Sequence, residues 1–277
     1  MKLRYLFLIF SLYVFPPYVL SAPLATCHNG VSSGTSTNCT ITAGANKSLV
    51  VGTFTHSDGS AIGISGSSLT YTFIAGQFAH IAGDGASRGF KLFCVLSTGS
   101  GGSQTYTMTD TGTVDGIALL VAEYPAFTSC TPDGTPSVPC TFGLGSAGCT
   151  VGNPNSTISS GNLVTTASSD TVISMLQIAV AAGLSAGAPF TIQVTDNNWI
   201  DATQPFLMAD VELATAGTYN STYTAAGSQY WQSIIVAFPN APIVVNGGFP
   251  MVIKYRSMPR QRIPWDNRRR KLEIVRI

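Results

Sequence analysis

Short apolar runs separated by turn residues fill the middle of the chain. Between Thr40 and Ala241, runs rich in Val, Ile, Thr, Tyr and Phe alternate with clusters of Gly, Ser, Asn and Asp. β-branched and aromatic residues favour strands, and the residue types between them favour turns. The pattern predicts strands at 48–55, 69–74, 90–97, 104–109, 117–124, 172–181, 190–194, 207–214, 219–224 and 232–238.

One apolar segment, 172–184, is long enough for a helix. Its β-branched residues, the preceding Ser168-Ser169-Asp170 and the following Gly183 favour a strand instead. The chain is also only 10% charged, which is poor material for helices that need a solvated face. We therefore expect an all-β protein.

A weak internal repeat divides this region into two halves. Segment 93–125 contains a strand, a turn, Tyr106-Thr107, another turn and an apolar strand that ends at Tyr124-Pro125. Segment 208–239 follows the same order through Tyr223-Thr224 to Phe238-Pro239. Because neither half can bury a one-sided sheet alone, we expect them to share one core. The predicted fold is a two-sheet antiparallel β-sandwich, a jelly roll built from two similar halves, with the apolar strands central and the alternating strands outside.

The N-terminal 25 residues have the order of a secretory signal, in which basic, apolar and small residues follow one another. These are Lys2 and Arg4, the run 5–14, a Pro16-Pro17 break, and Ser21, Ala22 and Ala25. A membrane anchor needs about 20 uninterrupted apolar residues, and the prolines interrupt this run early. A lipid anchor at Cys27 is a second alternative, although Thr26 is an unusual neighbour for the acceptor. We predict a signal peptide at 1–25 and an extracellular or periplasmic protein.

Charge is distributed unevenly along the chain. Residues 26–250 contain three basic and eleven acidic residues, whereas residues 251–277 contain nine basic and two acidic ones. We therefore predict one domain at 26–250 and a basic tail at 251–277. Such a tail can contact an anionic envelope through ion pairing, and a disordered, solvated extension is the alternative.

All six cysteines follow the predicted signal: Cys27, Cys39, Cys94, Cys130, Cys140 and Cys149. An oxidising compartment would allow up to three disulfides, with 15 connectivities. No C-x-x-C pair with histidines at ligand spacing supports a metal site instead. Short loops favour Cys27 with Cys39, and Cys130 with either Cys140 or Cys149, inside a long loop at 130–161.

Three pieces of sequence support a resemblance to a known type of domain. They are Ser160 to Thr166, Leu119 to Tyr124, and Trp231 with Ile235 to Pro239. Together they resemble a recurring β-sandwich domain of bacterial secreted and phage-associated proteins, which is concanavalin-like in architecture. The resemblance covers about 40–241 and implies the fold and export. It implies no catalytic residue, and the cysteine-rich loop and the basic tail depart from the usual pattern.

Motifs for common enzyme chemistry are absent or out of context. The glycine pattern of 143–148 matches a dinucleotide fingerprint, but it lies between Cys140 and Cys149 without a βαβ unit, so we expect no nucleotide. The weak catalytic candidates are Asp210 and Glu212, which share a strand face and could serve a glycosidase as acid and base. The alternative is that both face solvent, alternating with buried Val211 and Leu213.

Aromatic and Asx residues form a candidate ligand-binding set: Trp199, Asp196, Asn198, Asp201, Tyr230 and Trp231. Exposed rings can stack on sugars, and the Asx side chains can hydrogen-bond hydroxyls or bind Ca²⁺. The EF-hand spacing is missing, which leaves calcium a weak expectation and no other cofactor implied. The alternative is that the rings fill the core and the Asx residues form turns.

These observations favour a non-enzymatic extracellular binding or adhesion module that recognises glycan or another cell-surface component. A structural or assembly protein of a virion or envelope is the alternative, and a glycosidase is the third candidate. Sequons at Asn38, Asn46, Asn155 and Asn220 would be glycosylated only in a eukaryotic secretory pathway, so they do not decide the source.

Overall fold

The computed structural model describes residues 23–56, 62–80, 87–111, 116–140, 155–178, 183–196 and 205–241. Every regular element in these ranges is a strand, which confirms the all-β prediction and makes 172–178 part of a strand rather than a helix. No helix that could cross a bilayer occurs in the described ranges. The predicted tail and nearly all of the predicted signal lie outside them.

The strands divide into two groups along the chain. The first half contains β1 (Ala25–Val31), β2 (Ser36–Ala43), β3 (Ser48–Thr55), β4 (Ile62–Ser65), β5 (Thr72–His80), β6 (Ser87–Val95), β7 (Gly102–Asp110) and β8 (Ile117–Tyr124). The second contains β9 (Asn155–Ser159), β10 (Leu163–Thr165), β11 (Asp170–Ile178), β12 (Ser185–Ala186), β13 (Thr191–Asp196), β14 (Phe206–Ala214), β15 (Gly217–Tyr219), β16 (Thr222–Gln229) and β17 (Trp231–Pro239).

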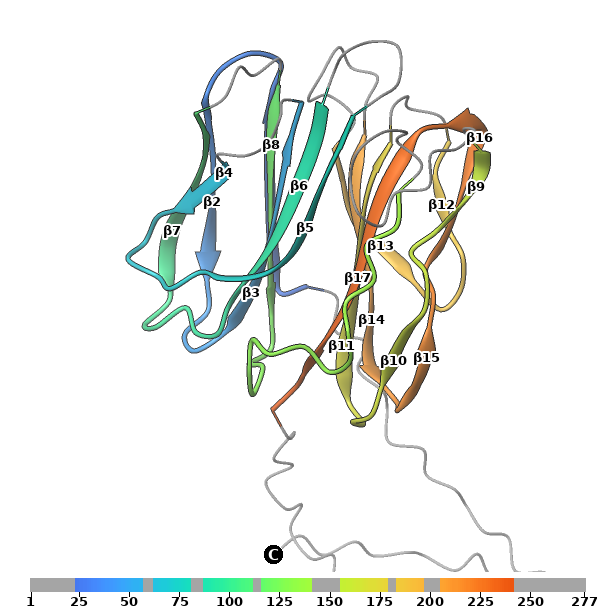
Figure 1. Cartoon of the computed structure of the whole chain (residues 1–277). Coiled ribbons are helices and arrows are strands. Elements are labelled where there is room, and N and C mark those ends of the chain that lie inside the picture. The colour runs from blue at the N-terminus through green and yellow to red at the C-terminus, as the bar shows by residue number, and fades with distance from the viewer. Residues whose placement is uncertain are drawn as a thin grey trace, which may run out of the picture. The chain divides into compact units, whose positions relative to one another are not determined.

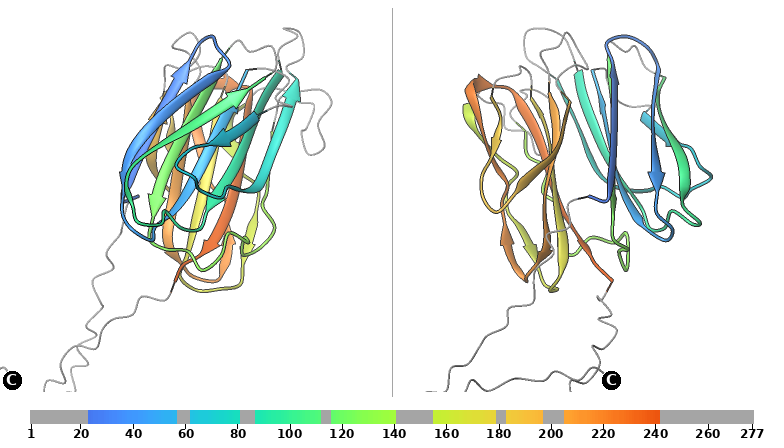
Figure 2. Two further views of the ribbon diagram at one scale, coloured as in Figure 1. Left: turned by 90° about the vertical axis from the view of Figure 1, so that its left-hand side faces the viewer. Right: turned by 180° about the vertical axis from the view of Figure 1, so that it is seen from behind.

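The strands form antiparallel sheets that stack in layers (Figures 1 and 2). Two central sheets, β1-β8-β3-β6-β5 and β13-β14-β11-β17, come one from each half and share a hydrophobic core. The outer sheet β2-β7-β4 covers the far face of the first central sheet. The outer sheet β12-β16-β9 and the pair β10-β15 cover the far face of the second.

Strand order repeats between the halves, in agreement with the two similar halves that the sequence predicts. The central order β8-β3-β6-β5 corresponds to β17-β11-β14-β13, and the outer order β2-β7-β4 corresponds to β9-β16-β12. Strand β1 and the pair β10-β15 have no counterpart in this comparison. The antiparallel sandwich made from two similar halves is thus observed, while the finer jelly-roll connectivity stays a prediction.

Burial explains why the central sheets need cover on both faces. Every residue of β3, β8 and β11 is buried, whereas β2 alternates strictly between exposed and buried positions. A strand that is apolar on both sides must pack against a layer on each side. The continuous strands are central and the alternating strands outer, as expected, but each half also supplies its own outer sheet.

The central core is filled by interlocking side chains of unequal size. Phe54 of β3 stacks on Phe206 of β14, with ring centroids 4.7 Å apart. Gly52 lies near the centre of β3, and Met175 lies near the centre of β11, its counterpart in the second half. A Cβ atom on Gly52 would lie 2.6 Å from Cε of Met175. Glycine here therefore makes room for the methionine side chain.

Disulfides join the layers, and they hold the segment that follows β8, which we call the connector (described at 125–140), to the core. Cys27 of β1 pairs with Cys39 of β2, as predicted, and so links a central sheet to its outer sheet. The predicted pairing of Cys130 with Cys140 or Cys149 is wrong, because Cys130 pairs with Cys94 of β6. Closing a longer loop costs little extra entropy, so loop length does not select the partner. Cys140 is also disulfide-bonded, and Cys149 lies outside the described residues.

The connector that follows β8 runs along the free edge of β17. Ser137 and Ile235 exchange two backbone hydrogen bonds, and the backbone NH of Asp133 donates to the carbonyl oxygen of Ala237 at 3.0 Å. An uncovered strand edge invites pairing with other chains. The connector thus protects this edge while it joins the two halves.

Replacing Gly52 with alanine is expected to lower the free energy of unfolding by about 1–3 kcal/mol, because the added methyl group overpacks the core against Met175. Urea unfolding measures this loss. Gly217→Ala is the matched control, since its Cβ would meet nothing closer than 3.9 Å. In a Met175→Ala background the cost of Gly52→Ala should disappear, and an unchanged cost would contradict this packing.

Candidate functional site

The predicted ligand-binding set does not form a described site. Trp199, Asn198 and Asp201 lie outside the described residues, and Asp196 ends β13 with a side chain that is not described. Tyr230 is half-buried between β16 and β17. For Trp231 the prediction of an exposed ring that binds ligand is wrong, because this residue is buried.

Trp231 is only 5% exposed, lies opposite Ile178 of β11 and belongs to the core of the second half. An indole buried in this way has no free face on which a sugar could stack. The alternative reading of this ring, that it fills the core, is the one the structure supports.

Asp210 is buried where the two halves meet. One carboxylate oxygen accepts a hydrogen bond from the Tyr124 hydroxyl at 2.8 Å, and the other accepts one from Nε2 of Gln193 at 2.7 Å. Tyr124 belongs to β8 of the first half, whereas Asp210 and Gln193 belong to β14 and β13 of the second. The expected solvent-facing position of Asp210 is wrong, because this residue is only 3% exposed.

Burial is the largest influence on the pKa values in the network of Tyr124, Asp210 and Gln193, which links the two halves. It raises the pKa of Asp210, and the hydrogen bonds from Gln193 and Tyr124 lower it in part. Burial also raises the pKa of Tyr124 well above its usual value, and the charge of Asp210 adds to that shift. Glu212, two positions further along β14, is half-buried and contributes to the same shift. The network ties the halves together and leaves Asp210 enclosed rather than open to a substrate.

A second carboxyl pair, Asp133 and Asp170, was not anticipated from the sequence. Asp133 lies in the connector and accepts hydrogen bonds from the backbone NH groups of Ala167 and Thr166, both at 2.7 Å, and from the Thr166 hydroxyl at 2.8 Å. These donors, that of Ala167 first, lower the pKa of Asp133 to about 2.

Asp170, at the start of β11, is fully buried, and neither of its carboxylate oxygens has a hydrogen-bond donor among the described residues. Burial, followed by the neighbouring Asp133, raises the pKa of Asp170 to about 6. Below that pH a protonated Asp170 can donate to the Asp133 carboxylate. Between about pH 2 and pH 6 the pair therefore consists of one ionised and one neutral carboxyl.

The outer face of the sheet β2-β7-β4 carries a ladder of hydroxyl and amide side chains. Residues directly opposite one another on β2 and β7 share a face. The pairs are Ser36 with Thr109, Asn38 with Thr107, Thr40 with Thr105, and Thr42 with Ser103, and Ser65 of β4 lies beside Thr107. All are exposed except Thr107, which is half-buried. We call these residues the first hydroxyl face.

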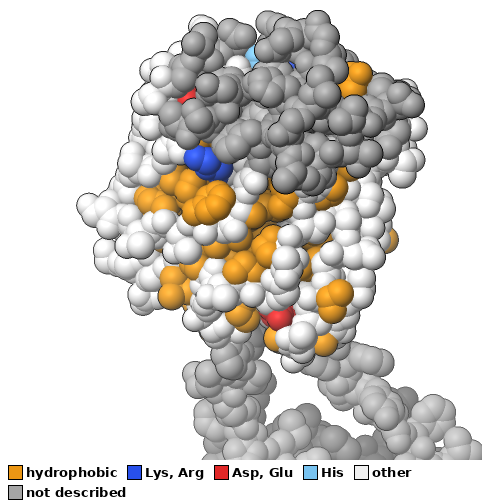
Figure 3. All heavy atoms as spheres, viewed as in Figure 1, with side chains coloured by type: hydrophobic (Ala, Val, Ile, Leu, Met, Phe, Trp, Pro, Cys, Tyr) orange, Lys and Arg blue, Asp and Glu red, His pale blue; other side chains and the backbone are white. Residues whose placement is uncertain are grey.

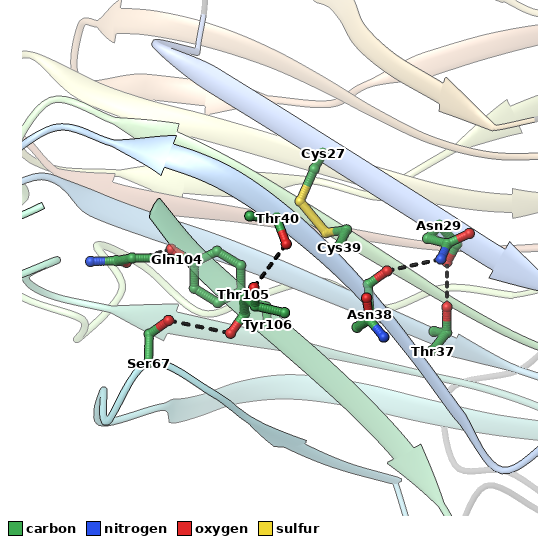
Figure 4. The surroundings of a disulfide bond; sticks show 10 residues. All are labelled: Cys27, Asn29, Thr37, Asn38, Cys39, Thr40, Ser67, Gln104, Thr105 and Tyr106. Atoms are coloured by element: carbon green, nitrogen blue, oxygen red, sulfur yellow. Dashed lines mark hydrogen bonds between the residues drawn. A yellow bond between two sulfur atoms is a disulfide. The ribbon is translucent and has the colours of Figure 1, made fainter. Parts of the chain in front are cut away.

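The strands of the first hydroxyl face are joined to each other on the face itself and to β1 behind it (Figure 4). The hydroxyls of Thr40 and Thr105 lie 2.8 Å apart across the strands. On the inner side of β7, the Tyr106 hydroxyl donates to Oε1 of Gln104 at 2.6 Å. Cys39, on the inner side of β2, anchors that strand to β1 through its disulfide. Fixed strands fix the spacing of the hydroxyls they carry.

The corresponding outer sheet of the second half carries a similar set. Thr222 lies opposite Ser159, and Thr224 lies between Thr157 and Ser185. Ser159 is half-buried and the other residues of this set are exposed. We call these five residues the second hydroxyl face.

Neither hydroxyl face presents a charge. Asp110 is the one acidic or basic residue in β2, β4, β7, β9, β12 and β16, and it is fully buried and accepts a hydrogen bond from the Thr55 hydroxyl. More widely, every Lys, Arg, Asp and Glu side chain that the structure describes is buried or half-buried. Accordingly, acidic and basic side chains occupy little of the surface in Figure 3.

No group of three or more His, Cys, Asp or Glu side chains in the described ranges is placed to hold a metal ion. Two of the residues proposed for Ca²⁺ from the sequence, Asn198 and Asp201, lie outside those ranges. No family model, curated protein or solved structure matches the chain. The resemblance to a concanavalin-like domain thus stays an expectation from sequence.

Replacing Tyr124 with phenylalanine should lower the free energy of unfolding by about 1–3 kcal/mol, because a buried Asp210 oxygen loses its donor. The variant should also raise the folded-state pKa of Asp210 further. Its extra instability should therefore grow as pH rises and the buried carboxyl ionises. Urea unfolding at pH 5 and pH 8 measures this. In an Asp210→Asn background the effect should no longer depend on pH.

Asp170→Asn should become more stable relative to the natural protein as pH rises from 4 to 7. Asp170 has a folded pKa of about 6, above its unfolded value of 3.8, so its stabilising contribution is complete below pH 3.8 and is lost as pH rises through 6. An asparagine amide can still donate to Asp133 but does not ionise. After allowance for solvent screening, we expect a gain on the order of 1 kcal/mol at pH 7. Equal pH profiles of the two proteins in urea unfolding would contradict the raised pKa of Asp170.

Proposed function

We propose that the protein is a non-enzymatic extracellular binding module for a neutral, hydroxyl-rich polysaccharide. The single observation that carries the proposal is the ladder of paired Ser, Thr and Asn side chains on the first hydroxyl face. A hydroxyl both donates and accepts hydrogen bonds, as do the hydroxyls of a sugar. The face and the polymer therefore match in chemistry.

Charge further selects the class of partner. The first hydroxyl face lacks a carboxylate for a cationic ligand and a Lys or Arg for an anionic one. A neutral polysaccharide requires neither. Since the rings of Tyr106 and Tyr223 point into the cores, recognition would rest on many hydrogen bonds along a polymer rather than on stacking of one sugar. Such binding gains strength from repetition, so long chains should bind better than short ones.

The observations that would favour an enzymatic function are weaker than those that favour a binding function. Of the two carboxyl groups that the sequence brings forward for a glycosidase, Asp210 is enclosed by Tyr124 and Gln193. Asp170 is fully buried beside Asp133 of the connector and is closed off from a substrate as well. Neither arrangement places an acid and a base across an open space, as glycoside hydrolysis requires.

A structural role in an envelope or virion is a second candidate, favoured by the scarcity of exposed charge among the described residues. Surfaces with little charge tend to associate. On this reading the hydroxyl faces would pack against other copies of the chain. Stable oligomers on sizing, without binding to polysaccharide, would favour this candidate.

The experiment is a sedimentation assay of the full secreted chain with insoluble cellulose, chitin and mannan. We expect the protein to sediment with at least one of them at both low and high salt, because no ion pair is involved. The variant Thr40→Val/Thr105→Val keeps the side-chain shape and removes two hydroxyls, so we expect the affinity of the first hydroxyl face to fall on the order of 10-fold, for about 1.4 kcal/mol in hydrogen bonds.

Thr218→Val is the matched control, since Thr218 is an exposed threonine of β15 outside both hydroxyl faces. It should bind like the natural protein. Failure of the natural protein to sediment with any of these polymers, or unchanged sedimentation when Thr40→Val/Thr105→Val is combined with Thr157→Val/Thr224→Val on the second hydroxyl face, would overturn the proposal.

A further inference from the structure

The second hydroxyl face occupies the same place in its half as the first does in its own. Both belong to three-stranded outer sheets of equivalent order, β2-β7-β4 and β9-β16-β12. In each sheet the middle strand carries exposed threonines opposite hydroxyl partners, for example Thr105 opposite Thr40 and Thr224 opposite Thr157. The two faces therefore offer the same chemistry.

The two faces point in opposite directions. Each outer sheet covers the outward face of one central sheet, and the central sheets pack against each other through their inward faces. The two views of Figure 2 and the view of Figure 1 agree that the outer sheets are the outermost layers on opposite sides. One flat polymer surface cannot touch both faces at once.

The connection between the two faces is rigid. Val50, Ile173 and Phe206 lie in one continuous core that includes strands of both halves, and the Tyr124–Asp210 hydrogen bond crosses the same boundary. The Cys94–Cys130 disulfide holds the connector to that core. A ligand bound on one side is thus kept at a fixed separation from a ligand bound on the other.

From this arrangement we infer that the protein is bivalent and cross-links two separate chains of neutral polysaccharide, one on each hydroxyl face. This inference rests on the proposed function and adds to it the number of sites and their opposed directions. The partner is neutral because the strands of both faces lack any exposed acidic or basic side chain. Bridging rather than simple coating is the expected consequence.

The test is a sandwich assay on the full secreted chain. Protein is loaded on insoluble mannan, cellulose or chitin, washed, and then offered a fluorescent soluble polymer of the same class, namely mannan, hydroxyethyl cellulose or glycol chitin. Bivalent protein captures the fluorescent polymer. We expect the natural protein and Thr218→Val to capture it.

Variants in one face separate binding from bridging. Thr40→Val/Thr105→Val weakens the first face and Thr157→Val/Thr224→Val weakens the second, and valine suits strand positions, so both should fold. Matching thermal unfolding verifies this. Each should still sediment with the insoluble polymer but lose at least 10-fold of the captured fluorescence, and the combined variant should lose sedimentation as well.

The outcomes distinguish this inference from the function on which it rests. Sedimentation of the natural protein without capture of the soluble polymer would overturn bivalency and leave the binding function standing. Unchanged capture by Thr157→Val/Thr224→Val would also overturn it, because the second face would then have no part in bridging. Absence of sedimentation would overturn both.

Discussion

The fold depends on one constraint, which is that the central strands are apolar on both faces. Strands such as β3 and β11 bury every residue, so each central sheet needs a packed layer on either side. The inward faces of the two central sheets pack against each other, and their outward faces pack against the outer sheets. The layered stack, the rigid join between the halves and the outward direction of both hydroxyl faces all follow from this requirement.

Much of this layered arrangement can be predicted from the sequence, because the burial of a strand determines how apolar residues are spaced along it. Continuous apolar runs mark β8 and β17, and the alternation of β7 marks an outer strand. The repeat between the halves is visible for the same reason. The spacing of apolar residues does not predict the number of layers. A strand that is apolar on both faces must be covered, but its sequence does not identify the element that covers it.

The site was harder to predict because it depends on register and on distant contacts. The alternating threonines of β2 and β7 are visible in the sequence, but only the pairing of Thr40 with Thr105 turns them into one ladder. Asp133 and Asp170 are separated along the chain and meet only because the connector follows β17. Trp231 misled the prediction, because an aromatic residue at the start of a strand fits a binding platform and a core equally well, and its burial decides between them.

The central claim is that uncharged, rigid strand faces, rather than loops, meet the ligand. Hydrogen exchange followed by mass spectrometry, with and without soluble mannan, hydroxyethyl cellulose or glycol chitin, tests it most directly. The account predicts slower exchange in peptides covering 36–43, 102–110, 155–159 and 222–229, with little change in the central strands. Protection confined to other segments, or none with any of these polymers, would contradict it.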